Sequence, residues 1–466
     1  MLFNSLDYLI FLPLVVVAFY LIPNRFRWVL LLAASYYFYM CWKWQYIFLI
    51  VISTMVDFYA GIQIAKTPDK KKKRWFLMLS LFVNLGFLFY FKYFNFFTEN
   101  TSIILSQFNI LANFEYYDIL LPVGISFYTF QTLSYTIDVY QGKSEPETHL
   151  GYFALYVAYF PQLVAGPIER STRLIPQLKR APNVTSDDIR YAVNKILLGF
   201  FKKLVVADTV SQYVNLVYAN VDGTTGSQLY WAAFLFAVQL FADFSGYTDI
   251  AMGSARLMGV RLMENFNKPM WQENHSQYWS NWHISLTSWI RDYIYIPLAK
   301  INRSKGALML WSVFILVLIG FWHGANWTFI VFGFVNGIVM LIQRLIRNTA
   351  FGKLLRSNVF TLRLQKYFNF NLLILEAVYF RSIDLNMAHK IYGKIFTEFN
   401  LNIGELLSLY KFEFVMAMGV SGLLWVTVLF NKNLKFKYNW LYVTVMLFLI
   451  IFLGQDLKNS FVYFQF

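Results

Sequence analysis

The chain has 466 residues, of which 58% are hydrophobic and 20% aromatic, and a formal net charge of +15. This composition is too apolar for a soluble globular protein and predicts an all-α membrane protein with several spans. The positive charge does not indicate nucleic-acid binding, because the basic residues fall in short loops between apolar runs, where the positive-inside rule explains them. The single cysteine, Cys41, excludes an internal disulfide and a cysteine-rich metal site, and we expect it to be a small packing residue.

Apolar runs with few charges recur along the whole chain. Most of them approach or exceed the roughly 20 residues that a helix needs to cross a bilayer. Met1–Ile22 has no basic residue ahead of its apolar stretch, so we expect a retained first span rather than a signal peptide. In total we expect about ten transmembrane helices. The later runs are Trp28–Trp42, Tyr46–Ala65, Trp75–Phe97, Leu121–Tyr140, Leu229–Gly253, Leu308–Ile342, Phe414–Phe430 and Leu441–Leu453.

The charges between these runs predict the topology of the first half of the chain. Arg25–Arg27 and Lys70–Arg74 both belong in the cytosol if the two runs between them cross the membrane, which places the N-terminus outside. The loop Thr98–Asp118 carries acids but no lysine or arginine, as expected for an outer loop. Two lone acids, Asp57 and Asp138, are expected to be satisfied carboxylates at interfaces or helix ends.

Two apolar segments do not fit a single straight crossing. Gly151–Ile168 contains Pro161, Gly166 and Pro167 and is followed by another basic region, so we expect a re-entrant segment that does not cross. As one helix, Leu308–Ile342 would be roughly 52 Å long against a membrane core of about 30 Å. Because both of its flanks are basic, we expect a hairpin with both ends in the cytosol and its turn near residues 322–327.

A polar thread lies in an apolar run in the second half of the chain. Asp243 and Asp249 enclose Ser245 and Tyr247, which is more polarity than packing alone would select at membrane depth. On a regular helix the two carboxylates would point about 240° apart, so we do not expect them to form an acid/base pair. We expect one of them to pair with Arg256 or with a histidine ring.

Two histidines in apolar sequence make the chain a candidate enzyme. His323 would lie at the apex of the expected hairpin, where an ionisable side chain is costly and therefore indicates function, although close helix packing explains the glycines around it. His283 lies among tryptophans and tyrosines and fits either a membrane interface or a site, whereas His275 is interpreted as an interface residue. No zinc motif, phosphate-binding glycine loop or nucleophile elbow occurs in the sequence.

Seven segments resemble, in order, the motifs of membrane-bound O-acyltransferases. The resemblance covers roughly residues 5–345 and is nearest to the bacterial branch that contains the alginate O-acetyltransferase membrane subunit, with the D-alanyl transfer protein of teichoic acid synthesis as a cousin. Residues 346–466 are less distinctive, and we expect one membrane domain over 1–466. The segments are Leu121–Tyr140, Pro161–Ile168, Asp243–Asp249, Glu264–Pro269, Trp282–Leu286, Arg291–Pro297 and Trp322–Gly324.

The resemblance implies a fold and a chemistry. The fold would be about ten transmembrane helices with re-entrant and interfacial helices around a central tunnel, entered by the donor from the cytosolic face. The family's characteristic histidine falls on His323, the expected general base, and the second falls on His283, which would position donor or acceptor with Asp249 or Tyr247 as orienting groups. Further substrate-binding candidates are Asp243, Ser245, Trp282, Trp322 and Asn326.

The resemblance also implies substrates and partners. It points to acetyl-CoA as acetyl donor, to no tightly bound cofactor or metal, and to an extracytoplasmic acetyltransferase partner of the SGNH type in a bacterial inner membrane. Where relatives often have two arginines, this chain has Ser280 and Asn281, a departure that bears on the identity of the donor or carrier. Three functions stay open: acetyl transfer toward a cell-surface polysaccharide such as alginate, D-alanyl or other acyl transfer from a carrier to teichoic acid or lipid, and a non-catalytic polysaccharide translocase or scaffold.

Overall fold

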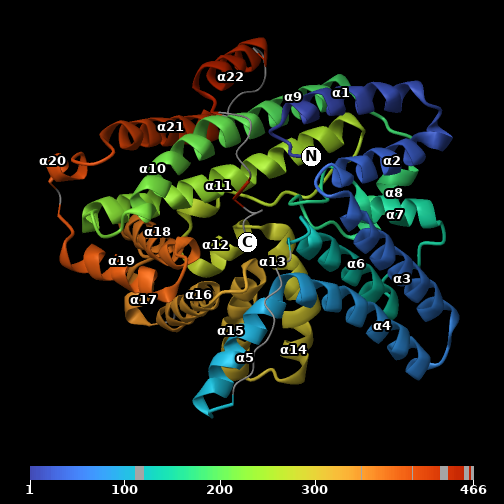
Figure 1. Cartoon of the computed structure of the whole chain (residues 1–466), viewed down its shortest axis with the longest axis horizontal. Coiled ribbons are helices and arrows are strands. Elements are labelled where there is room, and N and C mark those ends of the chain that lie inside the picture. Colours follow the sequence, from blue (N-terminus) through green and yellow to red (C-terminus); the bar gives the residue numbers. More distant parts are fainter. Residues whose placement is uncertain (111–119, 348, 401, 431–438, 456–460, 463–466) are drawn as a thin grey trace. The chain divides into compact units, whose positions relative to one another are not determined.

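The computed structural model describes residues 1–110, 120–347, 349–400, 402–430, 439–455 and 461–462 (Figure 1). The regular structure of these residues is helical, which confirms the all-α prediction. Five helical segments are long and apolar enough to cross a membrane, and two shorter helices, Leu6–Leu21 and Trp440–Leu453, are also apolar. The expected count of about ten spans is therefore not confirmed. The five segments are Trp44–Lys66, Lys70–Gln107, Gly226–Leu257, Lys305–His323 and Trp327–Ile346.

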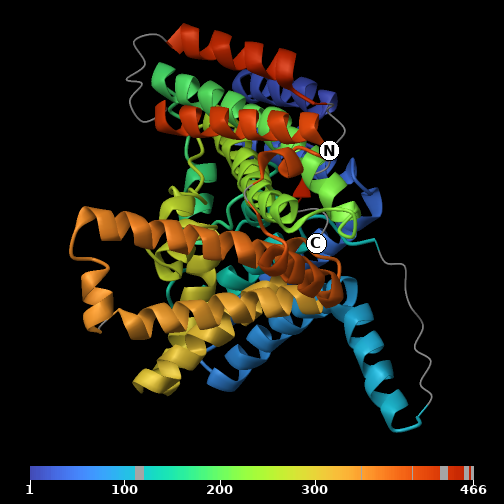
Figure 2. The same ribbon diagram turned by 90° about the vertical axis from the view of Figure 1, so that its left-hand side faces the viewer.

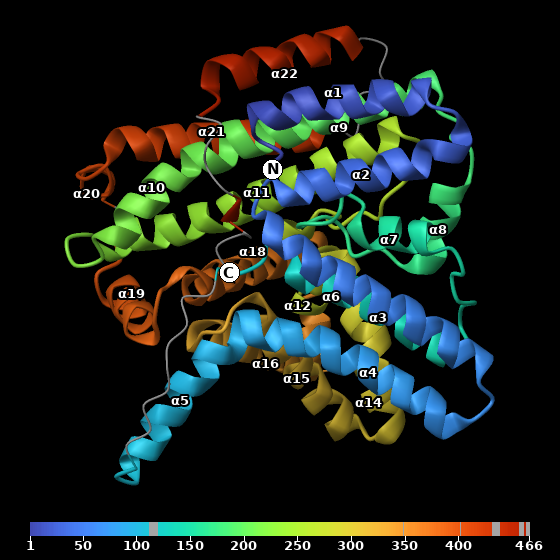
Figure 3. The ribbon, with the colours of Figure 1, turned by 45° about the vertical axis from the view of Figure 1, so that its right-hand side comes forward.

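The chain divides into two compact units, of which the first comprises Met1–Ala192 and Ala251–Met263. Helices α3, α4 and α6 pack against one another in this unit (Figure 3). Cys41 lies at the C-terminal end of α2 and is exposed, so the expectation that it packs is wrong. The helices that begin in this unit are α1 Leu6–Leu21, α2 Arg27–Met40, α3 Ile47–Lys66, α4 Lys70–Leu88, α5 Phe94–Gln107, α6 Ile125–Tyr140, α7 Leu150–Ala158, α8 Ser171–Lys179 and α9 Ser186–Phe200.

A buried carboxylate joins these three helices. Asp57 of α3 accepts hydrogen bonds from Ser80 Oγ and from Asn84 Nδ2 of α4, the latter at 2.9 and 3.1 Å, and from Thr136 Oγ1 of α6 at 3.3 Å. Asp57 is satisfied, as expected, but in the middle of a helix and fully buried rather than at a helix end. In an apolar interior such donors offset much of the cost of desolvating a carboxylate.

The expected re-entrant segment contains only a short helix. Helix α7 ends at Ala158, so it is about 14 Å long and covers half of a hydrocarbon core of about 30 Å. The irregular chain that follows packs against Gly124, which has a left-handed φ of 80° and whose added Cβ would lie 2.8 Å from the carbonyl oxygen of Leu163. The interruption by Pro161 and Gly166 is confirmed, whereas its place in the membrane remains a prediction.

The fourth apolar run, Trp75–Phe97, departs from the expectation. Helix α4 continues through a π-helical turn at Phe89–Tyr93 into α5, so the chain is helical up to Gln107. The expected outer loop from Thr98 is wrong for its first half, and residues 111–119 lie outside the described part of the chain. A continuous helix of this length, about 57 Å at 1.5 Å per residue, extends well beyond one bilayer core.

The second unit comprises Val193–Ile250 and Glu264–Phe466. Its hydrophobic core is built from α10, α11, α18, α19 and α21 around a π-helical turn at Phe201–Ala207 (Figure 1). Helix α11 begins here and ends in the first unit. The helices are α10 Asp208–Ala219, α11 Gly226–Leu257, α12 His275–Asn281, α13 Ile284–Ile290, α14 Ile296–Ile301, α15 Lys305–His323, α16 Trp327–Ile346, α17 Ala350–Leu354, α18 Val359–Arg381, α19 Leu385–Thr397, α20 Ile403–Leu406, α21 Lys411–Phe430 and α22 Asn439–Leu453.

Helices α15 and α16 form the expected hairpin. Helix α15 ends at His323, α16 begins at Trp327, and the two helices pack along their length, with α18 against α16 (Figure 2). Gly320 and Gly333 permit this close approach, because an added Cβ would lie 2.1 Å from the carbonyl oxygen of Phe329 and 2.2 Å from that of Leu316, respectively. Both glycines therefore act in close helix packing, as the sequence predicts.

The hairpin makes a prediction about topology. In a Cys41→Ala background, cysteines introduced at Ser304→Cys and Ser357→Cys should both resist a membrane-impermeant maleimide in intact cells and react after permeabilisation, because basic residues flank both ends of the hairpin. Labelling yield is read by a gel shift. Reaction of either cysteine in intact cells would contradict the cytosolic placement.

Candidate active site

His283 lies in a tight connection between α12 and α13. Its backbone is left-handed, with φ 46° and ψ 53°, a conformation that a side chain larger than glycine adopts only when its surroundings hold it. The neighbouring Glu264–Pro269 segment does so: Asn265 accepts hydrogen bonds from the backbone N–H groups of Ile284 at 3.0 Å and Ser285 at 3.2 Å. Two motifs separated in sequence therefore fix one histidine.

His323 is fixed by the hairpin turn. It is the last residue of α15, and Gly324 and Asn326 lead into α16. Asn326 caps α16 by accepting a hydrogen bond from the N–H of Thr328 at 2.9 Å, and its own Nδ2 donates to the carbonyl of Ile383 at 2.9 Å. The amide of Asn326 is thus used at both ends to shape the turn, which favours a structural role over the substrate-binding role expected for it.

The two histidines meet around one tryptophan ring. The centroid of the Trp322 indole lies 5.9 Å from the His283 ring and 5.1 Å from the His323 ring. Phe244 packs edge-on against His283 at 4.7 Å, and Phe380 packs edge-on against His323 at 5.1 Å. Both imidazoles are buried. The structure thus brings His283, His323 and Trp322 together, as the sequence predicts.

A small cavity of about 40 Å³ adjoins His323. Trp282, another expected site residue, lines it, which places this indole beside the same histidine. Five of its thirteen lining residues are phenylalanine, tyrosine or tryptophan, and its other polar side chains are His323, Glu376 and Asn336. The cavity holds about three water-sized groups, since each needs roughly 10–15 Å³. The aromatic rings are those of Tyr278, Trp279, Trp282, Phe332 and Phe380.

A larger cavity of about 730 Å³ lies in the same unit. Ile319 lines it, one helical turn or about 6 Å before His323, and Ile284 brings its wall next to His283. Trp279 contributes to both cavities and its Nε1 donates to Asn336 Oδ1 at 3.1 Å, so this indole forms part of the wall between them. The cavity also has a strongly basic lining, made by Arg291, Arg344, Arg347 and Arg356.

The aspartates of the polar thread have partners that sequence reasoning missed. Asp249 pairs with Lys195 and Lys202, each at 2.6 Å, and Asp243 pairs with Lys203 at 2.9 Å. The expected pairing of an aspartate with Arg256 or a histidine ring is wrong, because these lysines occupy the carboxylates and Arg256 pairs with Asp188 at 3.2 Å in the first unit. Lysines in an apolar run were the signal that could have revealed this network.

Further contacts hold Asp243 in this lysine network. Lys203 also pairs with Asp208 at 2.9 Å, and the second oxygen of Asp243 accepts the N–H of Val462 at 2.8 Å. Two aspartates on one helix thus bind different lysines, in agreement with the prediction that they do not act together. Of the remaining candidates, Ser245 and Tyr247 are buried, and the Tyr247 ring packs edge-on against Phe461 at 5.1 Å.

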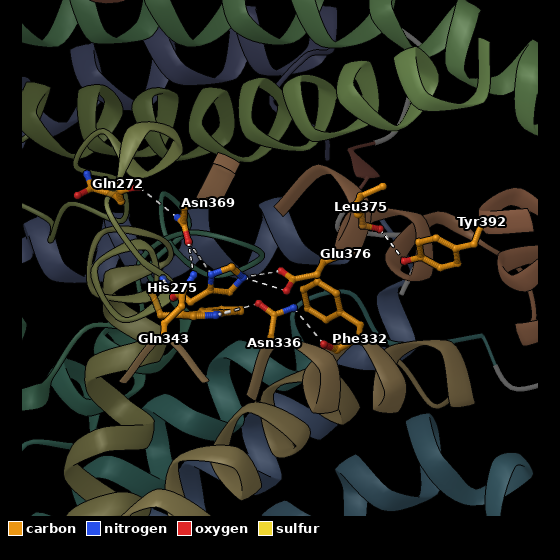
Figure 4. A network of polar contacts seen from close by, with 10 residues as sticks. Gln272, His275, Phe332, Asn336, Gln343, Asn369, Leu375, Glu376 and Tyr392 are labelled. Carbon is orange, nitrogen blue, oxygen red and sulfur yellow. Dashed lines mark hydrogen bonds and ion pairs between the residues drawn. The ribbon is translucent and has the colours of Figure 1, made fainter. Parts of the chain in front are cut away.

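His275 departs most from its interpretation. It is fully buried, so its expected place at an interface is wrong. Its Nδ1 lies 2.8 Å from Asn369 Oδ1, and its Nε2 lies 2.9 Å from each carboxylate oxygen of Glu376 (Figure 4). Both partners come from α18, in the stretch of sequence that carried the least distinctive motifs. The sequence offered only Glu376 itself as a signal, an acid inside the apolar half of a helix.

Residues 146–380 match a family model described as "membrane-bound O-acyltransferase family". This range includes His283, His323 and Glu376. The chain belongs to the membrane-bound O-acyltransferase family. It is therefore a multi-pass membrane enzyme that transfers acyl groups to oxygen, and the non-catalytic translocase loses its support.

Individual relatives of this O-acyltransferase differ in their acceptors. The chain is 38% identical to the "probable alginate O-acetylase" of Azotobacter vinelandii, over 88% of the chain and 82% of that relative. It is 32% identical to the "peptidoglycan O-acetyltransferase" of Helicobacter pylori, over 78% and 72%. It is 29% identical to the "teichoic acid D-alanyltransferase" of Bacillus subtilis, over only 47% and 58%.

The glycine contacts predict how the hairpin supports activity. Gly320→Ala should lower the thermal midpoint of the purified enzyme and reduce acyl transfer, because its Cβ would collide with the backbone of α16 one turn before His323. Gly306→Ala on the same helix is the matched control, since no atom lies within 4 Å of its Cβ position. Equal behaviour of the two variants would show that the close approach is unimportant.

The buried lysines predict a graded loss of stability. Lys203→Met leaves the carboxylates of Asp208 and Asp243 without their cation and should destabilise the fold by about 3–5 kcal/mol. Lys195→Met, at a partly exposed position whose partner keeps Lys202, should cost less. Denaturant unfolding of the purified variants compares them, and an equal or reversed order would contradict the assignment.

Proposed function

We propose that this enzyme transfers acetyl groups from a cytosolic thioester donor toward the O-acetylation of a cell-surface polysaccharide such as alginate. The observation that carries the proposal is that buried His323 lines a cavity of acetyl size, and that Trp279 of the same cavity also lines a much larger cavity with four arginines. The relatives with the highest coverage bear O-acetyl-transfer names, which favours acetyl over other acyl groups. A bacterial inner membrane is the matching location.

The large cavity suits a phosphorylated donor. Four arginines can bind phosphate groups bidentately, as the pyrophosphate and 3′-phosphate of acetyl-CoA require. The cavity is lined by the first turns of α15 at Ser312 and the last turns of α16 at Arg344, the ends that the charge pattern assigns to the cytosol. Ser280, which stands where related sequences often have arginine, lines the same cavity, so this chain supplies its basic groups from other positions.

His323 is the proposed general base. The acceptor hydroxyl attacks the thioester carbonyl while His323 takes its proton, and the resulting imidazolium returns that proton to the departing thiolate. The products are an O-acetyl ester and a free thiol, so atoms and protons balance without a metal or a tightly bound cofactor. His283, across the Trp322 ring, positions the reacting groups, and the aromatic walls exclude water that would hydrolyse the thioester.

The acceptor and the partner are inferred from relatives rather than from geometry. Acetyl groups would pass to the outer face and onto the polymer through an extracytoplasmic SGNH-type acetyltransferase. The alternative is D-alanyl or other acyl transfer from a carrier protein to teichoic acid or lipid, which the arginine-lined cavity also accommodates because a carrier's phosphopantetheine has a phosphate. The lower identity and half-chain coverage of the D-alanyl relative place this alternative second.

Removing the base should abolish transfer. In a deletion strain complemented with His323→Ala, the O-acetyl content of the surface polysaccharide should fall about 10²- to 10⁴-fold at equal membrane levels, because proton transfer in the transition state is lost. His389→Ala, at an exposed position on α19, is the control and should behave as wild type. Full acetylation by the His323 variant would overturn the assignment, and D-alanine on teichoic acid in place of acetyl would support the alternative.

The size of the small cavity predicts acyl selectivity. An acetyl group has three non-hydrogen atoms and matches about three water-sized positions, whereas longer chains would collide with the aromatic walls. Phe332→Ala should therefore raise the rate with butyryl-CoA relative to acetyl-CoA by about tenfold or more. Phe334→Ala, an exposed position on the same helix, is the matched control. Unchanged selectivity in both variants would contradict selection at this cavity.

A further inference from the structure

The buried pair of His275 and Glu376 has no role in the chemistry described so far. Both ring nitrogens of His275 face acceptor atoms: Nδ1 faces Asn369 Oδ1 at 2.8 Å and Nε2 faces the carboxylate of Glu376 at 2.9 Å (Figure 4). Asn369 is oriented by two further bonds, since Gln343 Nε2 donates to its Oδ1 at 2.9 Å and its own Nδ2 donates to the carbonyl of Gln272 at 3.2 Å. Nδ1 of His275 is thus a donor.

The proton count of the pair follows from these partners. With Nδ1 protonated, the contact between Nε2 and Glu376 contains one proton, either on the imidazolium or on the carboxyl group. In both forms the pair is neutral as a whole, which lowers the desolvation cost of burying it. In the imidazolium form Glu376 is a carboxylate, which His275 holds in place from one side.

Glu376 shares a cavity with the proposed base. Glu376 and His323 both line the cavity of about 40 Å³, together with Asn336. Asn336 is fixed by accepting the indole N–H of Trp279 at 3.1 Å and by donating to the carbonyl of Phe332 at 3.0 Å. The cavity therefore has both a held acidic side chain and the proposed base in its lining.

We propose that Glu376, held by His275 and Asn369, is a positioning residue for His323 across this cavity. This inference rests on the proposed function of His323. When His323 accepts the acceptor's proton it becomes an imidazolium, and a fixed carboxylate in an enclosed apolar site stabilises that charge and orients the ring. His275 acts one step further out by keeping the carboxylate aimed at the cavity.

Glu376→Gln is the first test, because it keeps the shape and a hydrogen-bonding group toward His275 while it removes the charge. The initial rate of polysaccharide O-acetylation, at matched membrane levels, should fall about 10- to 100-fold. The dissociation constant of the purified protein for acetyl-CoA and its thermal midpoint should stay within twofold and about 2 °C of wild type, respectively. Glu376→Asp should restore part of the rate because it restores the charge.

Two comparisons make the result decisive. Glu398→Gln, the same exchange at a half-exposed position near the end of α19, should leave the rate unchanged. A wild-type rate for Glu376→Gln would overturn the inference while leaving His323 as base, and so would a loss of rate accompanied by an equal loss of thermal stability that Glu376→Asp does not rescue. Failure of the proposed function is distinct, because wild type itself would then show no acetyl transfer from acetyl-CoA.

Discussion

The interior of this protein is so apolar that every buried charge or hydrogen-bonding group needs a partner supplied by the fold. Asp57 meets hydroxyl and amide donors from two neighbouring helices, Lys203 meets two aspartates, and His275 meets a glutamate and an amide. Each set joins helices that are distant in sequence. The polar groups therefore specify which helices pack together, a task that uniformly apolar surfaces perform poorly in lipid.

The close hairpin of α15 and α16 converts this packing into a site. Glycines at the contact let the two backbones approach closely, which restricts the conformations of side chains on the turn. Two of these side chains are Trp322 and His323. His283 reaches the same indole from a strained left-handed turn that Asn265 holds. The geometry around both histidines depends on backbone contacts rather than on long flexible side chains, which suits the proposed role of His323, because a general base tolerates little displacement.

The sequence predicted those features that follow from local chemistry. Length, hydropathy and basic flanks were sufficient for the hairpin and its turn, and proline and glycine positions were sufficient for the interruption after Ala158. The partners of buried charges were not predictable from the sequence. Whether Asp249 pairs with Arg256 or with Lys202 depends on the rotation of each helix about its axis. In a run that is apolar on all sides, hydrophobic periodicity gives no information on that rotation. His275 was assigned to an interface for the same reason. Its neighbours in the sequence are aromatic and basic, but the residues that bind and bury it lie on α18, about a hundred residues later.

In the proposed function, the two cavities would divide the demands of acyl transfer between them. A large, basic space can hold a highly charged donor by electrostatics that need no fine shape, whereas a small aromatic space accepts only the group that reacts. Trp279 belongs to both walls, and its indole N–H is tied to Asn336, so the division between the spaces is itself held by a hydrogen bond. In the proposed function, Arg344, Arg347 and Arg356 would bind the donor's phosphates in place of arginines at positions 280 and 281, so these phosphates would lie toward α16 and α17.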